Sequence, residues 1–464
     1  MKTKLQNQPK QKTKINLHTL PVIEPNAAGI DIGHREHWCA VAPDRCEKPV
    51  RSFGTFTGDL EKMADWLQQC GIKTVAMEST GVYWIPAFQI LERRGFAVRL
   101  VNARHVKNVS GRKSDVLDCQ WLQRLHSYGL LNGSFRPEDQ MCVLRAFLRY
   151  RDELVCARSV QSQHMQKALQ QMNVQLHQVL SDVTGVSGLR IIQAILAGER
   201  DVQRLAGLAD RRVRASQATI EKALRGDYRV EQLFLLQSAL DLYQTYEQKI
   251  HLCDERIIAQ LAKLPSRVDL KQKPVPSRKP GRPRLADMVA GTDLREELYR
   301  CTGVDLTAIE GIGVLTAQVL ISEIGLDMTG WRSEKHFASW LGLCPDNRIS
   351  GGKVLSSHTR HVLNPVADAL RIAATTLQHS KTALGAFYRR MRAKLGAASA
   401  ITATAHKLAR LVYRLLKHGE LYVQQGLEAY ENKHRERLLY NLKKTAASLG
   451  LEVIQKQPLA PAVS

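Results

Sequence analysis

The sequence predicts an α/β domain followed by an all-α remainder. In the first third of the chain, short apolar runs rich in β-branched and aromatic residues alternate with helical stretches. From about residue 138 strand signals nearly vanish, and Arg, Gln and Leu recur at helical spacing. A chain of 464 residues with 44% hydrophobic residues can bury two or three separate cores without disulfides. We therefore expect several domains.

The first domain is expected to contain a mixed sheet with helices on both faces. Its apolar runs are short and are interrupted by Gly, Pro and charged residues, as strands are. The predicted elements are strands at 30–32, 38–41 and 50–56, a helix at 59–70, a strand at 74–77, a helix at 83–93, a strand at 96–101 and a helix at 114–128. Three strands followed by alternating helix and strand are typical of this architecture.

The middle region is predicted to be a helical hairpin or coiled-coil spacer. Apolar residues at steps of three and four form one seam along a long helix. They are Leu236, Leu240, Tyr243, Tyr246, Ile250, Cys253, Ile257, Leu261 and Leu264. Residues 265–284 then carry five prolines and seven basic residues against one acid, which predicts an extended basic linker. Helical patterns resume at about residue 294 and continue to about 450.

These patterns divide the chain into six segments. The predicted segments are a disordered basic tail (1–26), the α/β domain (27–137), a helical or coiled-coil region (138–264), a Pro-rich basic linker (265–290), a mostly helical domain (291–450) and a second tail (451–464).

The charge balance points to a polyanionic partner. The chain has 67 Lys and Arg against 44 Asp and Glu, a formal net charge of +23, and nucleic acid is the first candidate for a large basic protein. No run reaches the roughly 18 apolar residues that span a bilayer, and no signal peptide is recognisable, so we expect no membrane partner. Nine scattered cysteines without a CxxC pair fit a reducing cytoplasm.

Four acidic residues of the first domain form a candidate metal site. Asp31 and Glu78 each end a predicted strand, while Asp115 and Asp118 are three residues apart on a predicted helix and share a face. Four carboxylates converging on one sheet edge could hold one or two Mg²⁺ ions, or Mn²⁺, and so position a phosphodiester. Each part has an alternative: Asp31 also fits the phosphate-binding turn of actin-like and sugar-kinase ATPases, and an acidic helical pair is often a solvated face.

Basic residues surround the helical pair in the sequence. They are Arg104, Lys107, Arg112 and Lys113. They are candidates for contacts with backbone phosphates, and the alternative is a solvated surface.

A turn with two glycines precedes a helix in the last domain. Gly311 and Gly313 flank one apolar residue, as in a helix-hairpin-helix, whose helix N-terminus can meet a phosphate oxygen. The alternative is an ordinary Gly-rich turn between packed helices.

Ser350 is a candidate nucleophile. It precedes two glycines and has Arg348 and Lys353 alongside, so its hydroxyl is sterically open and electropositive, as attack on a phosphodiester requires. The serine could equally cap a turn, and Ser356 and Ser357 are rival candidates.

Taken together, these motifs resemble a known family. The matching stretches are AGIDIG (28–33), AMESTGVYW (76–84), SDVLDC (114–119), GVSG (185–188), IEGIG (309–313), WLGLCP (340–345) and ISGGK (349–353). The chain resembles the insertion-sequence transposases that join an RNase H-like, Holliday-junction-resolvase-like (RuvC-like) DEDD domain to a C-terminal serine transposase domain, a group described as bridge-RNA-guided serine recombinases. The resemblance runs from about residue 27 to about residue 450, and the Pro-rich stretch 271–284 is an insertion relative to shorter members.

The resemblance implies a specific chemistry. The family's DEDD set falls on Asp31, Glu78, Asp115 and Asp118, which would hold Mg²⁺, and its catalytic serine falls on Ser350, which would form a transient phosphoserine link to DNA. It also implies a homo-oligomer, a dimer or a tetramer built on the helical middle region, with the two halves of the active site from different subunits. A structured noncoding guide RNA would pair with donor and target DNA, in a bacterial cytoplasm at the nucleoid.

Three other functions stay open from the residues alone. In the first, the α/β domain is a metal-dependent nuclease or Holliday-junction resolvase that uses water as nucleophile, and Ser350 only caps a turn. In the second, the chain is a noncatalytic nucleic-acid-binding protein. The third is a sugar-kinase-like ATPase, although the sequence lacks a recognisable second phosphate loop.

Overall fold

The chain divides into two compact units. A computed structural model describes residues 21–79, 81–101, 115–131, 133–277 and 287–452. The units are Met1–Arg136 and Pro137–Ser464. Each is described below by itself.

The first unit is an α/β domain with one mixed sheet and helices, as predicted. Its strands are β1 (Ala27–Ile32), β2 (Glu36–Ala40), β3 (Val50–Gly54), β4 (Thr74–Glu78) and β5 (Ala97–Val101). They lie in the order β3-β2-β1-β4-β5. The strand pairs β1–β2 and β2–β3 are antiparallel, whereas β1–β4 and β4–β5 are parallel. The helices are α1 (Thr57–Gln69), α2 (Trp84–Arg93) and α4 (Asp115–Ser127).

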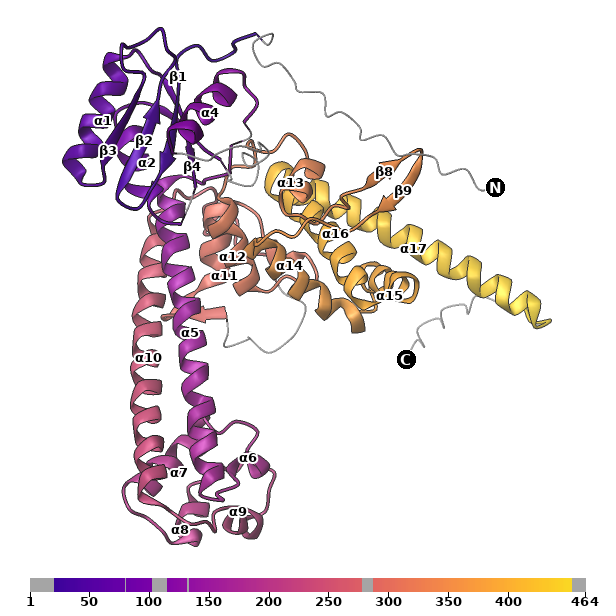
Figure 1. Cartoon of the computed structure of the whole chain (residues 1–464). Helices are drawn as coiled ribbons and strands as arrows, with labels where there is room; N and C mark the ends of the chain where they lie inside the picture. The colour runs from indigo at the N-terminus through magenta and orange to yellow at the C-terminus, as the bar shows by residue number, and fades with distance from the viewer. Residues whose placement is uncertain (1–20, 80, 102–114, 132, 278–286, 453–464) are drawn as a thin grey trace, which may run out of the picture. The chain divides into compact units, whose positions relative to one another are not determined.

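Helices cover both faces of this sheet (Figure 1). On one face Ile30 and Met77 pack with α1, whose buried residues Leu60, Met63 and Leu67 recur at steps of three and four. On the other face Leu122 of α4 packs against β4 and β5. Because strand side chains alternate between faces, each strand serves both cores.

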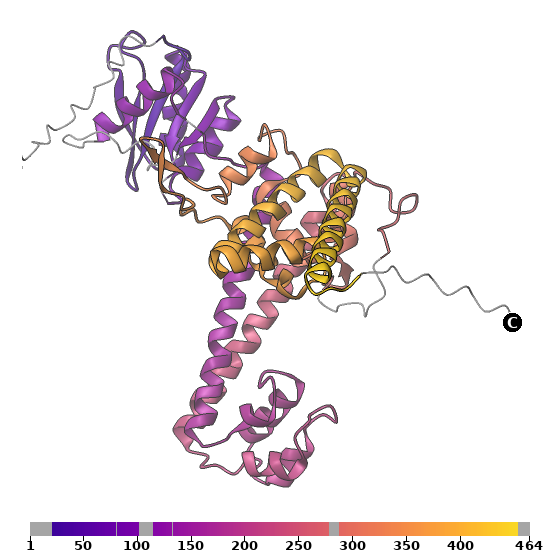
Figure 2. The same cartoon turned by 90° about the vertical axis from the view of Figure 1, so that its right-hand side faces the viewer.

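A helical hairpin dominates one part of the second unit (Figure 2). Its arms, α5 (Asp139–Gln171) and α10 (Val230–Ala262), have 33 residues each and pack along one another. The predicted seam is buried in α10, apart from Tyr246, which is half-buried. Four short helices join the two arms: α6 (Leu176–Val179), α7 (Val186–Leu196), α8 (Val202–Gly207) and α9 (Gln217–Ala223).

The remainder of this unit is mostly helical, as predicted. Its α-helices are α11 (Leu294–Thr302), α12 (Val314–Ile324), α13 (Glu334–Trp340), α14 (Pro365–Thr376), α15 (Ala383–Leu395), α16 (Ala397–His418) and α17 (Glu420–Ser448). The 3-10 helices η3 (Leu306–Ala308) and η4 (Leu377–His379) connect them. Trp331, Phe337 and Trp340 form an aromatic cluster with ring centroids 5.0–6.0 Å apart. None of the helices within the described ranges combines the length and the hydropathy needed to cross a membrane.

Two short hairpins that the sequence did not predict lie in the second half of the chain, one at the end of the predicted linker and one within the mostly helical domain. They pair β6 (Met288–Val289) with β7 (Thr292–Asp293) and β8 (Arg348–Ser350) with β9 (Lys353–Ser356). Gly351 and Gly352 join β8 to β9 with φ of 55° and 75°, which is the left-handed backbone of a type I′ turn. The helical expectation was therefore incomplete here.

The Pro-rich linker is not helical in its described part, but polar contacts hold it to α11. The Arg267 amide donates to the Arg300 carbonyl at 2.8 Å, and Arg295 donates to the Pro276 carbonyl at 2.8 Å. Local sequence does not show these contacts, because they depend on partners distant in sequence. Residues 278–286 fall outside the described ranges.

Candidate active site

Asp31 and Glu78 lie at the ends of two adjacent parallel strands. The parallel register of β1 and β4 ends with Ile30 opposite Met77, and Asp31 and Glu78 are the residues that directly follow this last pair. Neighbouring strands are about 4.8 Å apart. Both acidic residues are half-buried. The sheet therefore brings the first two carboxylates together, as the sequence predicts for strand ends.

Both carboxylates are on the face of the sheet that α4 covers. Ile30 and Met77 belong to the core on the α1 side. Since side chains alternate along a strand, the residues that follow them face the opposite side. Ala76, two residues before Glu78, packs with α4 residues and confirms the assignment of faces.

Helix α4 runs antiparallel to β1 in very close contact with it. A Cβ added to Gly29 would lie 2.3 Å from the Gln123 nitrogen and 2.5 Å from the Cys119 carbonyl oxygen, so only glycine allows this approach. Further along α4, Gln123 Nε2 donates to the Ala27 carbonyl at 3.4 Å. Later residues of α4 thus contact earlier residues of β1, and the first turn of α4 lies at the carboxyl ends of the strands.

The helical acidic pair occupies that first turn. Asp115 is the first residue of α4, and its side chain is not among those described. Burial, together with the negative charges of Asp31 and then Asp118, raises the pKa of the Cys119 thiol to about 12. Both carboxylates therefore act on one buried thiol, which stays protonated at neutral pH. This effect places Asp31 and Asp118 in one neighbourhood.

The chemistry of these residues fits a hard divalent cation. Carboxylate oxygens are the ligands that Mg²⁺ and Mn²⁺ prefer. Asp31 and Glu78 lie at adjacent strand ends, and Asp118 lies in the first turn of the helix that covers them, so carboxylates are the ligands available there. Among the described side chains, a set from which Asp115 is missing, no three His, Cys, Asp or Glu residues meet as a metal-binding group. A bound ion would have to draw these carboxylates together.

The basic residues predicted beside the acidic pair cannot be placed. Arg104, Lys107, Arg112 and Lys113 lie in 102–114, which the structure does not describe.

Ser350 ends β8 on an exposed ribbon. It is opposite Lys353 of β9, and both residues are exposed. Within the described residues the Ser350 hydroxyl has no hydrogen-bond partner, and the turn after it is made by two glycines. In contrast, Ser356 Oγ accepts a hydrogen bond from the His358 amide at 3.4 Å. Arg348 is exposed and opposite Ser356.

The two glycines of the predicted hairpin have different surroundings. A Cβ on Gly311, whose φ is 89°, would lie 2.9 Å from the Ala373 carbonyl oxygen of α14. Gly311 therefore lies in close contact with α14, where a larger residue would not fit. Gly313 is the N-cap of α12 and has no neighbouring atom within 4 Å of a Cβ, so this end of the turn is open.

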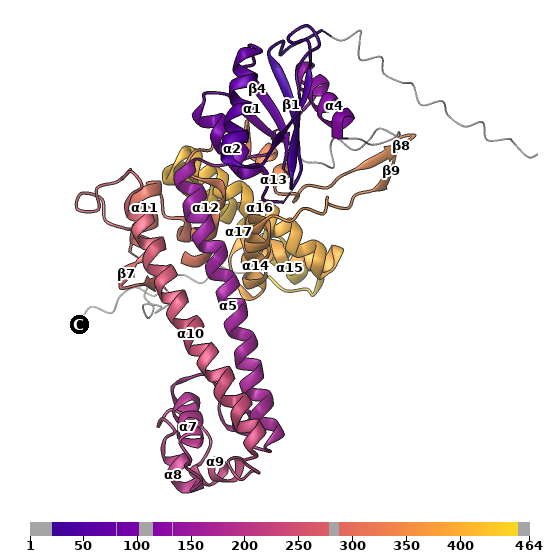
Figure 3. The same cartoon turned by 60° about the vertical axis from the view of Figure 1, so that its left-hand side comes forward.

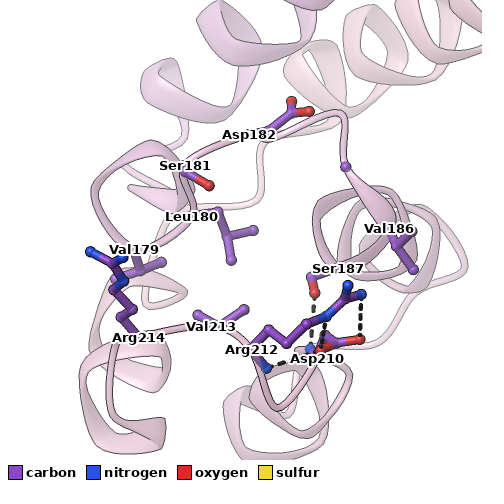
Figure 4. Close-up of a pocket in the computed structure, with 11 residues that line it drawn as sticks. Val179, Leu180, Ser181, Asp182, Val186, Ser187, Asp210, Arg212, Val213 and Arg214 are labelled. Carbon is purple, nitrogen blue, oxygen red and sulfur yellow. Dashed lines mark hydrogen bonds and ion pairs between the residues drawn. The ribbon is translucent and has the colours of Figure 1, made fainter. Parts of the chain in front are cut away.

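The GVSG motif has a structural role at the tip of the helical hairpin. A Cβ on Gly188 would lie 2.0 Å from the Val183 carbonyl oxygen. Ser187 Oγ accepts from the Asp210 amide at 2.9 Å, and hydrogen bonds from Arg212 lower the pKa of Asp210 to about 2. Ser187, Asp210 and Arg212 line a cavity of about 630 Å³ that contains none of the predicted site residues (Figure 4).

Gly29 is the positioning residue that the sequence reading missed. It holds no ligand, but it sets how closely α4 approaches Asp31. A glycine inside an otherwise apolar strand is a sign of close backbone approach, so the signal was present two residues before the acidic residue.

The sequence matches two transposase models. A family model described as "Transposase", with the short name DEDD_Tnp_IS110, matches residues 28–174. A second, described as "Transposase IS116/IS110/IS902 family", matches residues 305–389. The first covers the sheet and the acidic residues, and the second covers the Gly311 turn and the Ser350 ribbon. Both models describe transposases, so the chain is similar to transposases over these two stretches.

The chain belongs to the IS110 family. It is 33% identical over 129 residues to the candidate transposase y4pF/y4sB of Sinorhizobium fredii, a match covering 26% of this chain and 32% of that protein. It is 29% identical over 119 residues to an uncharacterised 43.6 kDa protein of the insertion element IS110 of Streptomyces coelicolor, covering 25% of this chain and 29% of that protein. The chain thus matches about a third of the length of these relatives.

Proposed function

We propose that this chain cuts and rejoins DNA to move an insertion sequence, with a divalent metal at Asp31, Glu78, Asp115 and Asp118 and with Ser350 as nucleophile. The main observation in support of this proposal is that strand register and side-chain alternation put Asp31 and Glu78 on one face of the sheet, beside the first turn of α4. The five-stranded sheet in the order β3-β2-β1-β4-β5 supports an RNase H-like, RuvC-like fold for this domain. A bound Mg²⁺ or Mn²⁺ would stabilise negative charge on the phosphodiester.

The reaction proposed for Ser350 is a transesterification. Ser350 Oγ loses its proton to solvent and attacks the phosphorus, and the bond from phosphorus to one bridging sugar oxygen breaks. That oxygen takes up a proton and leaves as a DNA hydroxyl. The exposed Ser350 on a turn of two glycines supports this role, because a phosphodiester can approach its hydroxyl without steric hindrance.

The contacts with nucleic acid form the second part of the proposal. Arg104, Lys107, Arg112, Lys113, Arg348 and Lys353 would bind phosphates, and the open amides after Gly313 would do so as part of a helix-hairpin-helix. The partners would be donor and target DNA and a structured noncoding guide RNA. The excess of 67 basic over 44 acidic residues supports a nucleic-acid partner of either kind.

The helical hairpin would join copies of the chain. We assign α5 and α10 to a coiled coil that builds a dimer or a tetramer. Their 33-residue lengths and buried apolar seam support an elongated spacer. Light scattering on the full chain, alone and with RNA and DNA, tests this assignment, and a monomeric mass in both states would reject it.

Covalent trapping tests the chemistry. Purified protein, RNA transcribed from its flanking DNA, labelled donor and target DNA and Mg²⁺ are combined and separated on a denaturing gel. Wild type should form a protein–DNA adduct, while Ser350→Ala and Asp118→Asn should not. Ser357→Ala is the matched control and should keep the adduct. If Ser350→Ala still cuts DNA, the serine step is wrong and the water-using nuclease or resolvase takes its place.

A further inference from the structure

The hairpin of β8 and β9 extends beyond its two named strands. Pro345 and Thr359 form an additional antiparallel bridge, and the Asp346 amide donates to the His358 carbonyl at 2.9 Å. The six residues 345–350 at about 3.3 Å per residue make a ribbon roughly 20 Å long. Figure 3 shows the ribbon reaching out from the helices of its own unit. We call residues 345–359 the ribbon.

Two successive cross-strand pairs near the tip of the ribbon differ in chemistry, and Leu355 of β9, which is 70% exposed, adds a further apolar side chain. Ser350 is opposite Lys353, whereas Ile349 is opposite Val354, so strand alternation separates a polar pair from an apolar pair. Ile349 is 62% exposed and Val354 is 58% exposed. In its sheet the ribbon contains only these two strands, so no third strand covers it in the described structure.

An isolated two-stranded hairpin is marginal in water, and packing its apolar side chains against another surface would stabilise it. The charges nearby select that partner. Arg348, Lys353 and Arg360 are exposed, and Asp346 is the single acidic residue of the segment 345–361. A cation precedes each residue of the apolar pair along its strand, so the ribbon carries both apolar and positively charged side chains. This combination fits a nucleic-acid duplex, which offers phosphates on both sides of a less polar groove.

The width of a two-stranded ribbon decides which groove of DNA it can enter. The major groove is about 12 Å wide and admits a two-stranded ribbon, whereas the minor groove is about 6 Å wide. The major groove also displays the thymine methyl group, which apolar side chains contact. We propose that the ribbon lies in the DNA major groove, with Ile349 and Val354 against thymine methyl groups. The inference depends on the proposed function only in that the partner is DNA.

A methyl-deletion experiment tests this docking. Binding of the full chain to a thymine-rich duplex and to the same duplex with uracil for thymine is measured at one fixed salt concentration. Wild type should bind the uracil duplex about fourfold more weakly for each methyl group that the ribbon contacts. The double variant Ile349→Ser, Val354→Ser should bind the two duplexes equally, because its ribbon no longer senses the methyl group.

Ile372→Ser provides the matched control. Ile372 is 67% exposed on α14, in the same unit but outside the ribbon, so this variant should discriminate as wild type does. Full discrimination by the double variant would overturn the inference. So would displacement of ribbon-dependent binding by a minor-groove ligand such as netropsin, or a change in the molecular mass of the DNA-free double variant, which would make the apolar pair a contact between copies.

The binding experiment tests the ribbon docking and the trapping experiment tests the serine chemistry, so either proposal can be rejected without the other. Ser350→Ala removes the proposed nucleophile and leaves Ile349 and Val354 in place, so it should keep the thymine–uracil difference. Cleavage by Ser350→Ala with that difference intact would reject the serine chemistry alone. Normal adduct formation by wild type without any thymine–uracil difference would reject the ribbon docking alone.

Discussion

Arg149 of α5 and Glu323 of α12 form a two-pronged ion pair. Arg149 Nε lies 2.9 Å from Glu323 Oε1, and its Nη2 lies 3.0 Å from Oε2. Arg145 adds a second cation, with its Nε 3.0 Å from Glu323 Oε2. The Glu323 side chain is only 8% exposed. This pair fixes the helical hairpin to the helix that follows the Gly311 turn.

Glu323→Ala should destabilise the second unit. It leaves two arginines facing each other with no carboxylate, and Arg145 is largely buried, so we expect a loss of about 2 kcal/mol. Urea unfolding followed by far-UV circular dichroism measures the change. Glu247→Ala removes an exposed pair with Arg158 on the same hairpin and should cost less than about 1 kcal/mol. Equal losses in the two variants would contradict the importance of burial.

Gly29→Ala should separate α4 from the sheet. The new methyl group would overlap the backbone of α4 at Gln123, and neither backbone can yield without moving the first turn that carries Asp118. We expect a cost of about 3 kcal/mol and faster amide hydrogen exchange in α4. DNA cleavage should fall as well.

Gly58→Ala is the matched control for this substitution. It lies in the first turn of α1, where a Cβ meets no atom within 4 Å. The variant should gain up to about 1 kcal/mol because alanine has less freedom in the unfolded chain. Unchanged exchange in α4 of Gly29→Ala would show that the helix does not depend on the close approach.

Much of the first unit follows from local pattern. Runs such as 75–77 are apolar and short, so they mark buried parallel strands, and the acidic residue after such a run must lie at the strand end. The juxtaposition of Asp31 and Glu78 was predictable for this reason. The close approach of α4 was not, because the distance between Gly29 and Gln123 depends on a tertiary contact across 94 residues.

The ribbon, in contrast, did not follow from local sequence pattern. Its strands have three and four residues, too few for alternation to stand out, and their side chains are exposed, so no core imposes a hydrophobic period. The pair Gly351 and Gly352 was the available signal for a hairpin turn. The sequence reading used those glycines as evidence for an accessible serine and missed the strands on either side.

Acid should weaken the first unit through His126. Thr74 Oγ1 donates to the Ala97 carbonyl at 3.0 Å, so it accepts from His126 Nε2 at 2.9 Å, and the ring is neutral with its proton on Nε2. His126 Nδ1 is buried without a hydrogen-bond partner. Burial, with a smaller contribution from the positive charge of Arg99, lowers the pKa of His126 to about 4.

The sign of the effect follows from the lowered pKa. The unfolded chain binds a proton at about pH 6.5 and the folded chain only near pH 4, so the stability is complete above pH 6.5 and falls as the pH drops through this window. The loss should approach about 3 kcal/mol at pH 4. Hydrogen exchange of α4 and β4 peptides between pH 7 and pH 4 measures it, after correction for intrinsic exchange rates. His126→Leu should flatten the slope, and an unchanged slope would assign it to other groups.

Divalent metal should stabilise the first unit through its carboxylates. Mg²⁺ or Mn²⁺ at about 100 times its dissociation constant raises the free energy of unfolding by about 2.7 kcal/mol when it binds only the folded state. Asp31→Asn and Asp118→Asn should lose this increase, because each removes a charged ligand. In metal-free buffer the same variants should be at least as stable as wild type, since fewer negative charges face one another.

Thermal unfolding with and without metal, in parallel with DNA cleavage, measures both effects. Asp44→Asn, an exposed acidic residue between β2 and β3, is the control and should keep the full response. An equal rise in melting temperature for all four proteins would locate the metal elsewhere, and cleavage that persists in a chelator would remove it from the reaction.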